Sequence, residues 1–225
     1  MEAKWIAHNG APKLILFFCG WGFDERCVGH LDTCGYDVVA LYDYRSLQAP
    51  VGITDGYSDI TVVAWSFGVW VANRSLALGE IQANKAFAIA GSTNPVSDTE
   101  GIPIAIFTGT VATLSVTSMS KFISRICGGA RRRDALVALM PQRDFYDQKE
   151  ELISLKQHFD NWNTPNNTIW TSALIATNDG IFSYKNLARH WGDKAITIND
   201  AHLCFGNISS WHQLLQLFEP CCNRS

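Results

Sequence analysis

Residues 60–72 read ITVVAWSFGVWVA, and this stretch decides the fold. An apolar, β-branched run ends at Trp65, and an apolar run with helical spacing begins directly after Ser66. A serine at such a junction is typical of a nucleophile elbow, in which small residues two before and two after the serine let the chain turn tightly. Ala64 and Gly68 occupy those two positions. The alternative is a serine that only caps the helix N-terminus.

Apolar runs on both sides of the elbow predict the remaining strands of a mostly parallel sheet. Unbroken apolar runs suit strands that are buried on both faces, and their alternation with helices is typical of a parallel α/β sheet. The predicted strands are residues 13–19, 36–42, 60–65, 83–90, 168–176 and 195–198, and the predicted helices are 66–78, 186–191 and 211–218.

The middle of the chain is less regular. Residues 118–159 have the apolar spacing of helices, which indicates a helical insert on the sheet. Residues 102–107, IPIAIF, have the composition of a strand, but Pro103 confines such a strand to a sheet edge or a loop.

A serine nucleophile needs a base, and the base needs an orienting carboxylate. In α/β-hydrolases these residues follow the chain order serine, acid, histidine. His202 comes after the strand predicted to end at residue 198, and Asp179 comes after the strand predicted to end at 176. The other histidines precede Ser66 or lie within predicted helices or the insert. Asp200 is the competing acid, but it would share the loop of His202, and Asp179 before glycine could also be a turn residue.

An oxyanion intermediate needs hydrogen-bond donors beside the serine. One is the backbone N–H of the residue after the nucleophile, Phe67, and the second comes from the loop after an early strand. The segment Gly20-Trp21-Gly22 follows the strand predicted at 13–19, and its glycines allow the backbone to approach a substrate. We therefore predict the Trp21 N–H as the second donor, although an ordinary strand-to-helix turn would use the same glycines.

The composition excludes several classes of protein. Of the 225 residues, 47% are hydrophobic and 17% charged, which excludes a disordered chain, and the net charge of −3 argues against a nucleic-acid partner. No apolar run has the length of a membrane helix. The seven cysteines form no C-x-x-C pair, so no metal site is expected. Without a signal-peptide pattern, we expect free thiols and a cytoplasmic location.

Several separated motifs carry a resemblance to a known family. These are FFCGWGFD at 17–24, AWSFG at 64–68, GIPIAIF at 101–107, RICGG at 125–129 and Asp-Ala-His at 200–202. Together they resemble the BioG-type pimeloyl-[acyl-carrier protein] methyl ester esterases over nearly the whole chain. The resemblance implies a single α/β-hydrolase domain over residues 1–225, with helices on both faces of the sheet and a helical lid at about 93–165. It therefore also implies that residues 102–107 lead into the lid instead of forming a strand.

The resemblance also implies the chemistry. The family cleaves the methyl ester of pimeloyl-acyl-carrier protein, which completes the pimelate moiety for biotin, and it uses no metal or other cofactor. Its nucleophile, acid and base correspond here to Ser66, Asp179 and His202, and its oxyanion loop corresponds to residues 20–22.

The charge distribution favours an acidic partner such as an acyl-carrier protein. Residues 121–149 contain seven basic and three acidic side chains, a local charge of +4 that leaves −7 for the rest of the chain. A basic lid on an acidic protein suits docking of an acidic carrier and its phosphopantetheine phosphate. The candidate carrier-binding residues are Arg125, Arg132 and Arg143. The alternative is a solvated helix face.

Two other functions remain open at this stage. A short-chain acyl thioesterase or a general esterase would use the same serine, histidine and aspartate, because a thioester is also cleaved by such residues. A hydrolase fold could also serve as a binding domain without catalysis, which the presence of all three residues argues against.

Overall fold

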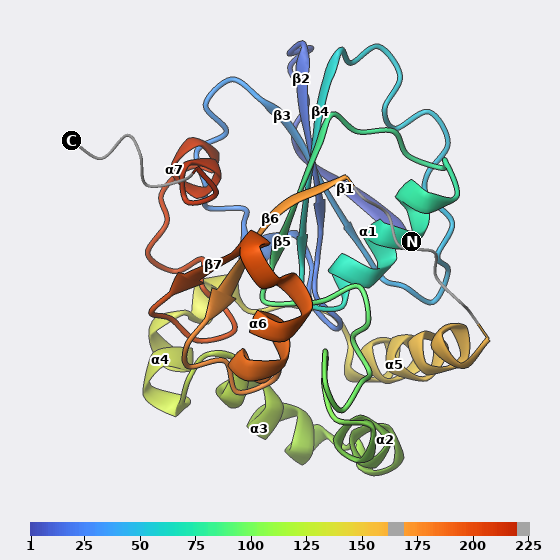
Figure 1. Cartoon of the computed structure of the whole chain (residues 1–225), viewed down its shortest axis with the longest axis vertical. Helices are drawn as coiled ribbons and strands as arrows, with labels where there is room; N and C mark the ends of the chain where they lie inside the picture. The colour runs from blue at the N-terminus through green and yellow to red at the C-terminus, as the bar shows by residue number, and fades with distance from the viewer. Residues whose placement is uncertain (162–168, 220–225) are drawn as a thin grey trace.

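The computed structural model describes residues 1–161 and 169–219, and it contains one seven-stranded sheet (Figure 1). The strand order is β1-β3-β2-β4-β5-β6-β7, in which β1 is antiparallel to β3 and every other pair is parallel. The strands are β1 (Glu2–Ala7), β2 (Lys13–Phe18), β3 (Asp37–Tyr42), β4 (Asp59–Trp65), β5 (Lys85–Ile89), β6 (Trp170–Ala176) and β7 (Ala195–Ile198).

The six parallel strands confirm the six strands predicted from sequence, although Thr168, the predicted start of β6, lies outside the described residues. Strand β1 was not predicted. Its sequence, EAKWIA, mixes polar and apolar residues and has no unbroken apolar run. An edge strand needs no such run, because neither of its faces is fully covered, and the side chains of β1 are exposed or half-buried.

Alternate side chains of the central strands supply two cores, one on each face of the sheet. In β2, Leu14, Leu16 and Phe18 belong to the core that α1 and α6 cover, whereas Ile15 and Phe17 belong to the core that α7 covers. This alternation follows from the two-residue period of a strand. The helices are α1 (Gly68–Ala77), α6 (Tyr184–Trp191) and α7 (Trp211–Gln216), and the short 3₁₀ turns beside this layer are η1 (Glu25–Cys27) and η3 (Gly192–Lys194).

A group of helices is inserted between β5 and β6, below the sheet in Figure 1. They are α2 (Ile104–Thr113), α3 (Val116–Ile126), α4 (Ala130–Ala135), η2 (Val137–Leu139) and α5 (Phe145–Asp160). We refer to α2–α5 as the insert. The strand that composition suggested at 102–107 is wrong, because Pro103 instead occupies the position before the first turn of α2. In that position proline has no helical N–H to lose.

Two further observations concern the length of the helices and the state of the cysteines. None of the described helices has the length and apolar composition needed to cross a membrane. The five cysteines within the described ranges carry free thiols, as predicted, while Cys221 and Cys222 lie outside those ranges.

The central strands should be the most sensitive part of the fold. Leu16 is fully buried in β2, so Leu16→Ala should lower the free energy of unfolding by about 2–5 kcal/mol, measured by urea denaturation. The matched substitution Leu78→Ala, at a side chain that is 45% exposed, should change it by less than about 1 kcal/mol. Equal losses at the two positions would contradict this placement of the core.

Candidate active site

The turn between β4 and α1 holds Ser66 in an unusual backbone conformation. Its φ is +59°, in the left-handed region that costs free energy for a residue other than glycine. Strand β4 ends at Trp65 and α1 begins at Gly68, so the turn takes only two residues. This strained strand–turn–helix geometry is that of a nucleophile elbow, and it explains why the sequence places small residues around the serine.

The small residues of the elbow are explained by the backbone segments that pass close to it. A Cβ on Gly68 would lie 2.5 Å from the carbonyl oxygens of Phe18 and Cys19, and a Cβ on Gly91 would lie 2.3 Å from the carbonyl oxygen of Ser66. Neither position therefore accommodates alanine. Ala64 lies within β4 and is fully buried there, which shows that its Cβ fits where many elbows have glycine.

Ser66, His202 and Asp179 form a continuous hydrogen-bonded chain. His202 Nε2 lies 2.9 Å from Ser66 Oγ, and His202 Nδ1 lies 2.8 Å from Asp179 Oδ2. The His202 ring and the Asp179 carboxylate are almost completely buried, with side-chain exposures of 1% and 0%. The structure thus brings together the three residues that the sequence suggested, from loops after β4, β6 and β7.

The acid is held in place by backbone donors. Asp179 Oδ1 accepts hydrogen bonds from the N–H groups of Ile181 (2.7 Å) and Phe182 (2.9 Å), so its other oxygen is free to face the imidazole. Asp200, the competing acid, instead accepts the N–H of Ala201 and pairs with an arginine. The geometry therefore selects Asp179 as the partner of the histidine.

The imidazole of His202 is also enclosed by aromatic rings. Phe182 stacks on it with centroids 5.8 Å apart and an interplanar angle of 5°, and Trp65 packs at 5.3 Å. The Trp65 indole Nε1–H donates to the His202 carbonyl oxygen at 3.0 Å. The ring plane and its loop are therefore fixed before any substrate binds.

The two predicted oxyanion donors lie beside Ser66. Neither the Trp21 N–H nor the Phe67 N–H has a hydrogen-bond acceptor within the described parts of the chain. A Cβ on Gly20 would lie 3.1 Å from the Ser66 Cβ, so the loop that carries Trp21 passes directly against the serine. We call residues 19–24 the oxyanion loop. Buried N–H groups left without acceptors beside a nucleophile are suited to binding a developing negative charge.

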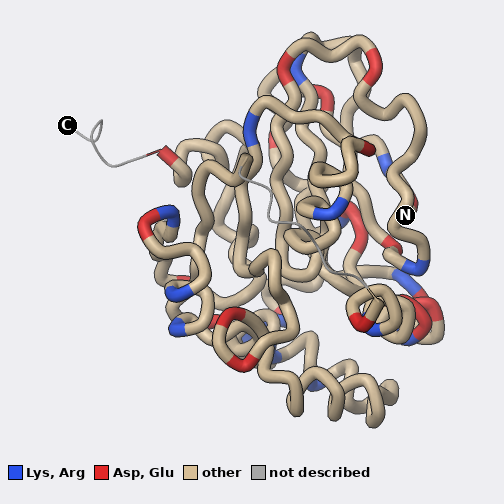
Figure 2. The backbone as a smooth tube through the Cα atoms, turned by 45° about the vertical axis from the view of Figure 1, so that its right-hand side comes forward, with Lys and Arg blue, Asp and Glu red and all other residues tan. Residues whose placement is uncertain are grey.

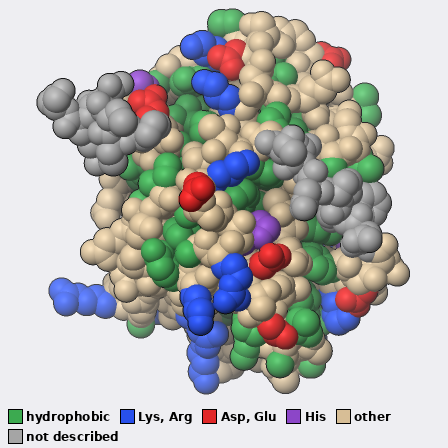
Figure 3. All heavy atoms as spheres, viewed as in Figure 1, with side chains coloured by type: hydrophobic (Ala, Val, Ile, Leu, Met, Phe, Trp, Pro, Cys, Tyr) green, Lys and Arg blue, Asp and Glu red, His purple; other side chains and the backbone are tan. Residues whose placement is uncertain are grey.

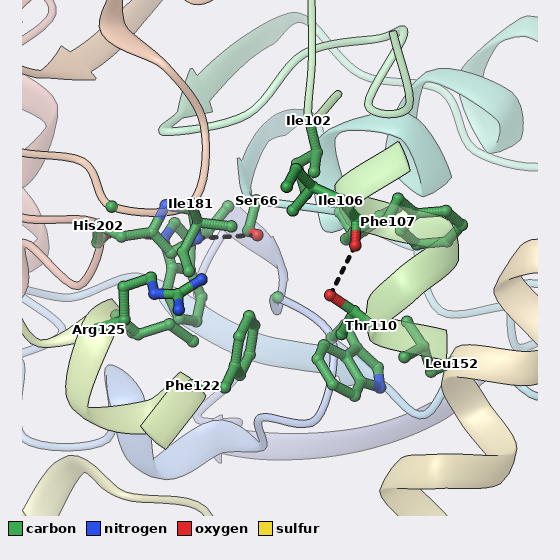
Figure 4. A pocket seen from close by; sticks show the side chains of 16 residues that line it. Ser66, Ile102, Ile106, Phe107, Thr110, Phe122, Arg125, Leu152, Ile181 and His202 are labelled. Atoms are coloured by element: carbon green, nitrogen blue, oxygen red, sulfur yellow. Dashed lines mark hydrogen bonds between the residues drawn. The ribbon is translucent and has the colours of Figure 1, made fainter. Parts of the chain in front are cut away.

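A pocket opens above Ser66 between the sheet and the insert (Figure 4). It contains about 580 Å³ of empty space, part of it open to solvent. Figure 4 shows the Ser66–His202 hydrogen bond at one end and side chains of α2, α3 and α5 around the remainder. The walls are mostly apolar, with Ile102, Ile106, Phe107, Phe122, Leu152 and Ile181 among them. Thr110 and Arg125 are the polar side chains of the insert at this pocket.

The three arginines suggested as carrier contacts lie in three different environments. Arg125 is exposed on α3 beside the pocket. Arg132 pairs with Asp200, and thereby ties α4 to the loop of His202. The Arg143 side chain is only 8% exposed and pairs with Glu151 and Asp43. The burial of Arg143 argues against direct contact with a carrier, and the ion pair of Arg132 with Asp200 gives that side chain a structural role.

The sequence analysis did not select Lys121 as a site residue. Lys121 and Arg125 are one turn apart on α3, so their side chains share a face. Both line a groove that continues from the pocket along Phe122 and Thr110. No carboxylate among the described residues pairs with either of them. The helical spacing of these two residues within the basic segment is the sequence feature that could have identified Lys121.

Comparisons with known proteins agree on one family. The model of the family described as pimeloyl-ACP methyl esterase BioG matches residues 1–214. The crystal structure of BioG from Haemophilus influenzae has a TM-score of 0.88 and 32% identity, covering 97% of this chain and 100% of that chain. A lipase-esterase related protein from Clostridium acetobutylicum, at 13% identity and a TM-score of 0.60 over 96% of each chain, shares the α/β-hydrolase fold.

Two curated relatives differ in how much of their own length matches this chain. An uncharacterised protein of Haemophilus influenzae is 33% identical over 95% of this chain and 99% of its own length. A malonyl-[acyl-carrier protein] O-methyltransferase of Bacteroides fragilis is 37% identical over 81% of this chain, but the match spans only 38% of that protein. The region shared with the second relative is therefore a minor part of a longer chain.

The close packing of the elbow leads to a testable expectation. Gly68→Ala should lower the melting temperature by several degrees, because the new Cβ would meet two backbone oxygens at 2.5 Å. Gly109→Ala, in α2 where nothing lies within 4 Å of the added Cβ, should have no such cost. Calorimetry of the two variants measures the difference, and a neutral Gly68→Ala would contradict the packing described.

Proposed function

Because this chain belongs to the BioG family of pimeloyl-ACP methyl esterases, we propose that it hydrolyses the methyl ester of pimeloyl-acyl-carrier protein to the free carboxylate and methanol. The observation that carries the proposal is the Ser66–His202–Asp179 chain at the base of an apolar pocket. In the proposed role the enzyme completes the pimelate moiety of biotin.

The proposed reaction starts with proton transfer from Ser66 to His202. As the Ser66 oxygen bonds to the ester carbonyl carbon, its proton moves to His202 Nε2, 2.9 Å away. The carbonyl oxygen becomes negative and accepts hydrogen bonds from the N–H groups of Trp21 and Phe67. When the C–O bond to methoxide breaks, the leaving oxygen takes the proton from His202 and departs as methanol.

Water completes the cycle by the same route. It attacks the acyl-Ser66 carbonyl carbon as His202 accepts its proton, and the Ser66 oxygen leaves and recovers that proton. Asp179 accepts hydrogen bonds from two backbone N–H groups and from the imidazole, and it stabilises the imidazolium in both halves of the reaction.

The pocket walls suit the acyl chain of this substrate. The methylenes between the two carbonyl groups of a pimeloyl chain can be buried against Ile106, Phe107 and Phe122. Burial of each methylene contributes about 0.8 kcal/mol, so the apolar wall favours a chain of several carbons over acetate. We propose that the helical insert is the lid predicted at about 93–165, of which 162–165 lie outside the described residues.

A carrier protein would dock on α3. Figure 3 shows basic side chains gathered in the region of α3 and α4, and Figure 2 shows that α2 beside them carries no charge. Lys121 and Arg125 lie along the groove that leaves the pocket, where the phosphate of a phosphopantetheine arm would pass. We therefore transfer the proposed carrier contact from Arg132 and Arg143 to Lys121, and keep Arg125.

The first prediction concerns the proposed nucleophile and base. Ser66→Ala and His202→Ala should each reduce methanol release from methyl pimeloyl-carrier protein by several orders of magnitude, with the melting temperature retained. Asp179→Asn should reduce it somewhat less, and Asp200→Asn much less, because Asp200 does not contact the imidazole. Mass spectrometry of the carrier checks that the thioester survives, since its loss would indicate a thioesterase. Retention of a tenth of the activity in Ser66→Ala would exclude the proposed reaction.

The second prediction concerns the carrier. Lys121→Gln with Arg125→Gln should raise KM for the carrier-linked substrate by about twofold to thirtyfold, because each exposed ion pair is worth ~0.2–1 kcal/mol. The loss on a p-nitrophenyl hexanoate ester, which has no carrier, should be much smaller. Added salt should weaken carrier binding by the wild-type enzyme in the same direction.

A matched control removes the same charge elsewhere. Lys185 and Arg189 are also one turn apart, but they lie on α6 outside the groove. The Lys185→Gln, Arg189→Gln variant should leave KM for the carrier-linked substrate nearly unchanged. If both double variants have the same effect, the groove has no specific role in docking.

A further inference from the structure

Helix α5 of the insert is attached directly to the oxyanion loop. The Trp21 indole Nε1–H donates to the Gln148 carbonyl oxygen at 2.7 Å. The Gln148 side-chain Nε2–H donates to the Gly22 carbonyl oxygen at 2.8 Å, and the Gly22 N–H donates to Glu151 Oε2 at 3.1 Å. Each of these bonds joins residues more than 120 positions apart in the sequence. Three hydrogen bonds thus connect one turn of α5 to the residues on which the proposed oxyanion donor lies.

Glu151 is a fully buried carboxylate that accepts hydrogen bonds from three groups. Its side chain is 0% exposed, and it accepts from Gly22 N–H, from Tyr44 N–H at 3.0 Å and from the Arg143 guanidinium. Burial raises the pKa of Glu151, and the nearby Arg143 charge opposes that rise. A buried acid that holds two backbone N–H groups fixes the backbone on both sides of it. The proposed reaction gives Glu151 no role. A different role is therefore needed to explain a buried carboxylate at this position.

Tyr44, whose backbone N–H donates to Glu151, also forms a hydrogen bond with the oxyanion loop. Its hydroxyl donates at 2.7 Å to the carbonyl oxygen of Cys19, the residue at which the oxyanion loop begins. Glu151 therefore restrains this loop at Gly22 directly and at Cys19 through Tyr44. The loop needs such restraint, because Gly22 adopts a φ of +76° that only glycine adopts readily, and no acceptor among the described residues holds the Trp21 N–H.

We propose that Gln148 and Glu151 are positioning residues, which hold the Trp21 N–H in the geometry that stabilises the oxyanion. This inference rests on the proposed function and adds a role for α5 within it. Neither side chain lines the pocket, so both act through the oxyanion loop. A displacement of about 1 Å in a catalytic group can cost up to about a hundredfold in rate, so small movements of this loop matter.

The test distinguishes two roles for these residues: positioning the oxyanion loop for catalysis, or only attaching α5 to that loop. Gln148→Met nearly preserves side-chain volume, removes only the donor to Gly22, and leaves no charge unpaired. Glu151→Gln combined with Arg143→Met removes both members of the buried ion pair, which avoids an isolated internal charge. Glu150→Gln is the matched control, because Glu150 is the adjacent residue of α5 but its side chain is 66% exposed.

Rates on p-nitrophenyl hexanoate are measured per titrated active site, so unfolded protein does not contribute. We expect kcat to fall about tenfold to a hundredfold in Gln148→Met and in the double variant, with KM changed less than threefold. Hexylboronic acid provides the second readout, because the Ser66 oxygen adds to boron, its proton passes to His202, and the anionic boronate oxygen occupies the oxyanion hole. Its inhibition constant should rise in parallel with the fall in kcat, while Glu150→Gln should match the wild type in both measurements.

Each outcome decides the question. If Ser66→Ala is inactive but Gln148→Met has wild-type kcat and boronate affinity, the positioning role is overturned and the proposed function stands. If the melting temperature falls while kcat per active site is unchanged, the bonds only fasten α5, and the role is again overturned. If Ser66→Ala remains active, the proposed function itself fails. If the double variant does not fold, Gln148→Met alone decides.

Discussion

The close contact of three strand ends is the constraint on which the active site depends. The carbonyl groups at the end of β2 meet Gly68, and the carbonyl group of Ser66 meets Gly91 after β5. This contact places the strained Ser66 backbone, the oxyanion loop and the start of α1 within one small volume. Since parallel strands end at the same edge, the aspartate loop after β6 and the histidine loop after β7 reach the same point. Backbone packing therefore brings the candidate groups together, and side chains such as Gln148 and Glu151 add the restraint proposed for the oxyanion loop.

The insert contributes to this arrangement from two sides. Ile126, at the end of α3, accepts the N–H of Leu203 at 3.0 Å, and Arg132 of α4 pairs with Asp200, so α3 and α4 hold the loop of His202. Helix α5 holds the oxyanion loop through Gln148. Helix α2 has one buried side chain, Phe107, and it contributes to the pocket wall. On the proposed function, movement of the whole insert would disturb the candidate catalytic groups, whereas movement of α2 alone would leave these contacts of α3, α4 and α5 in place.

Features of the fold and of the candidate site that depend on local sequence pattern could be predicted from the sequence. Unbroken apolar runs identified the parallel strands, and the order of serine, acid and histidine after successive strands identified Ser66, Asp179 and His202, which the structure brings together. Strand β1 was missed because an edge strand needs no apolar run. Composition alone suggested a strand where α2 begins, because an apolar helix beside a pocket has the composition of a strand, whereas the resemblance implied that this segment leads into a helical lid. Charge alone could not distinguish the buried Arg143 from the exposed Arg125, because pairing with Glu151 depends on tertiary packing.

The same packing suggests how one serine could choose between two ester groups. Methyl pimeloyl-carrier protein has a methyl ester at one end of the acyl chain and a thioester at the other, and Ser66 chemistry would cleave either. Thr110, Phe122 and Arg125 are shared by the pocket and the groove, so the groove continues from the apolar walls near Ser66 to Lys121 and Arg125, which pair with no carboxylate of the described chain. A phosphate held there cannot advance into the apolar pocket without losing its ion pairs and its hydration. On the proposed function, anchoring the phosphate fixes the reach of the pantetheine arm, and that reach would determine which of the two ester groups lies at the oxyanion hole.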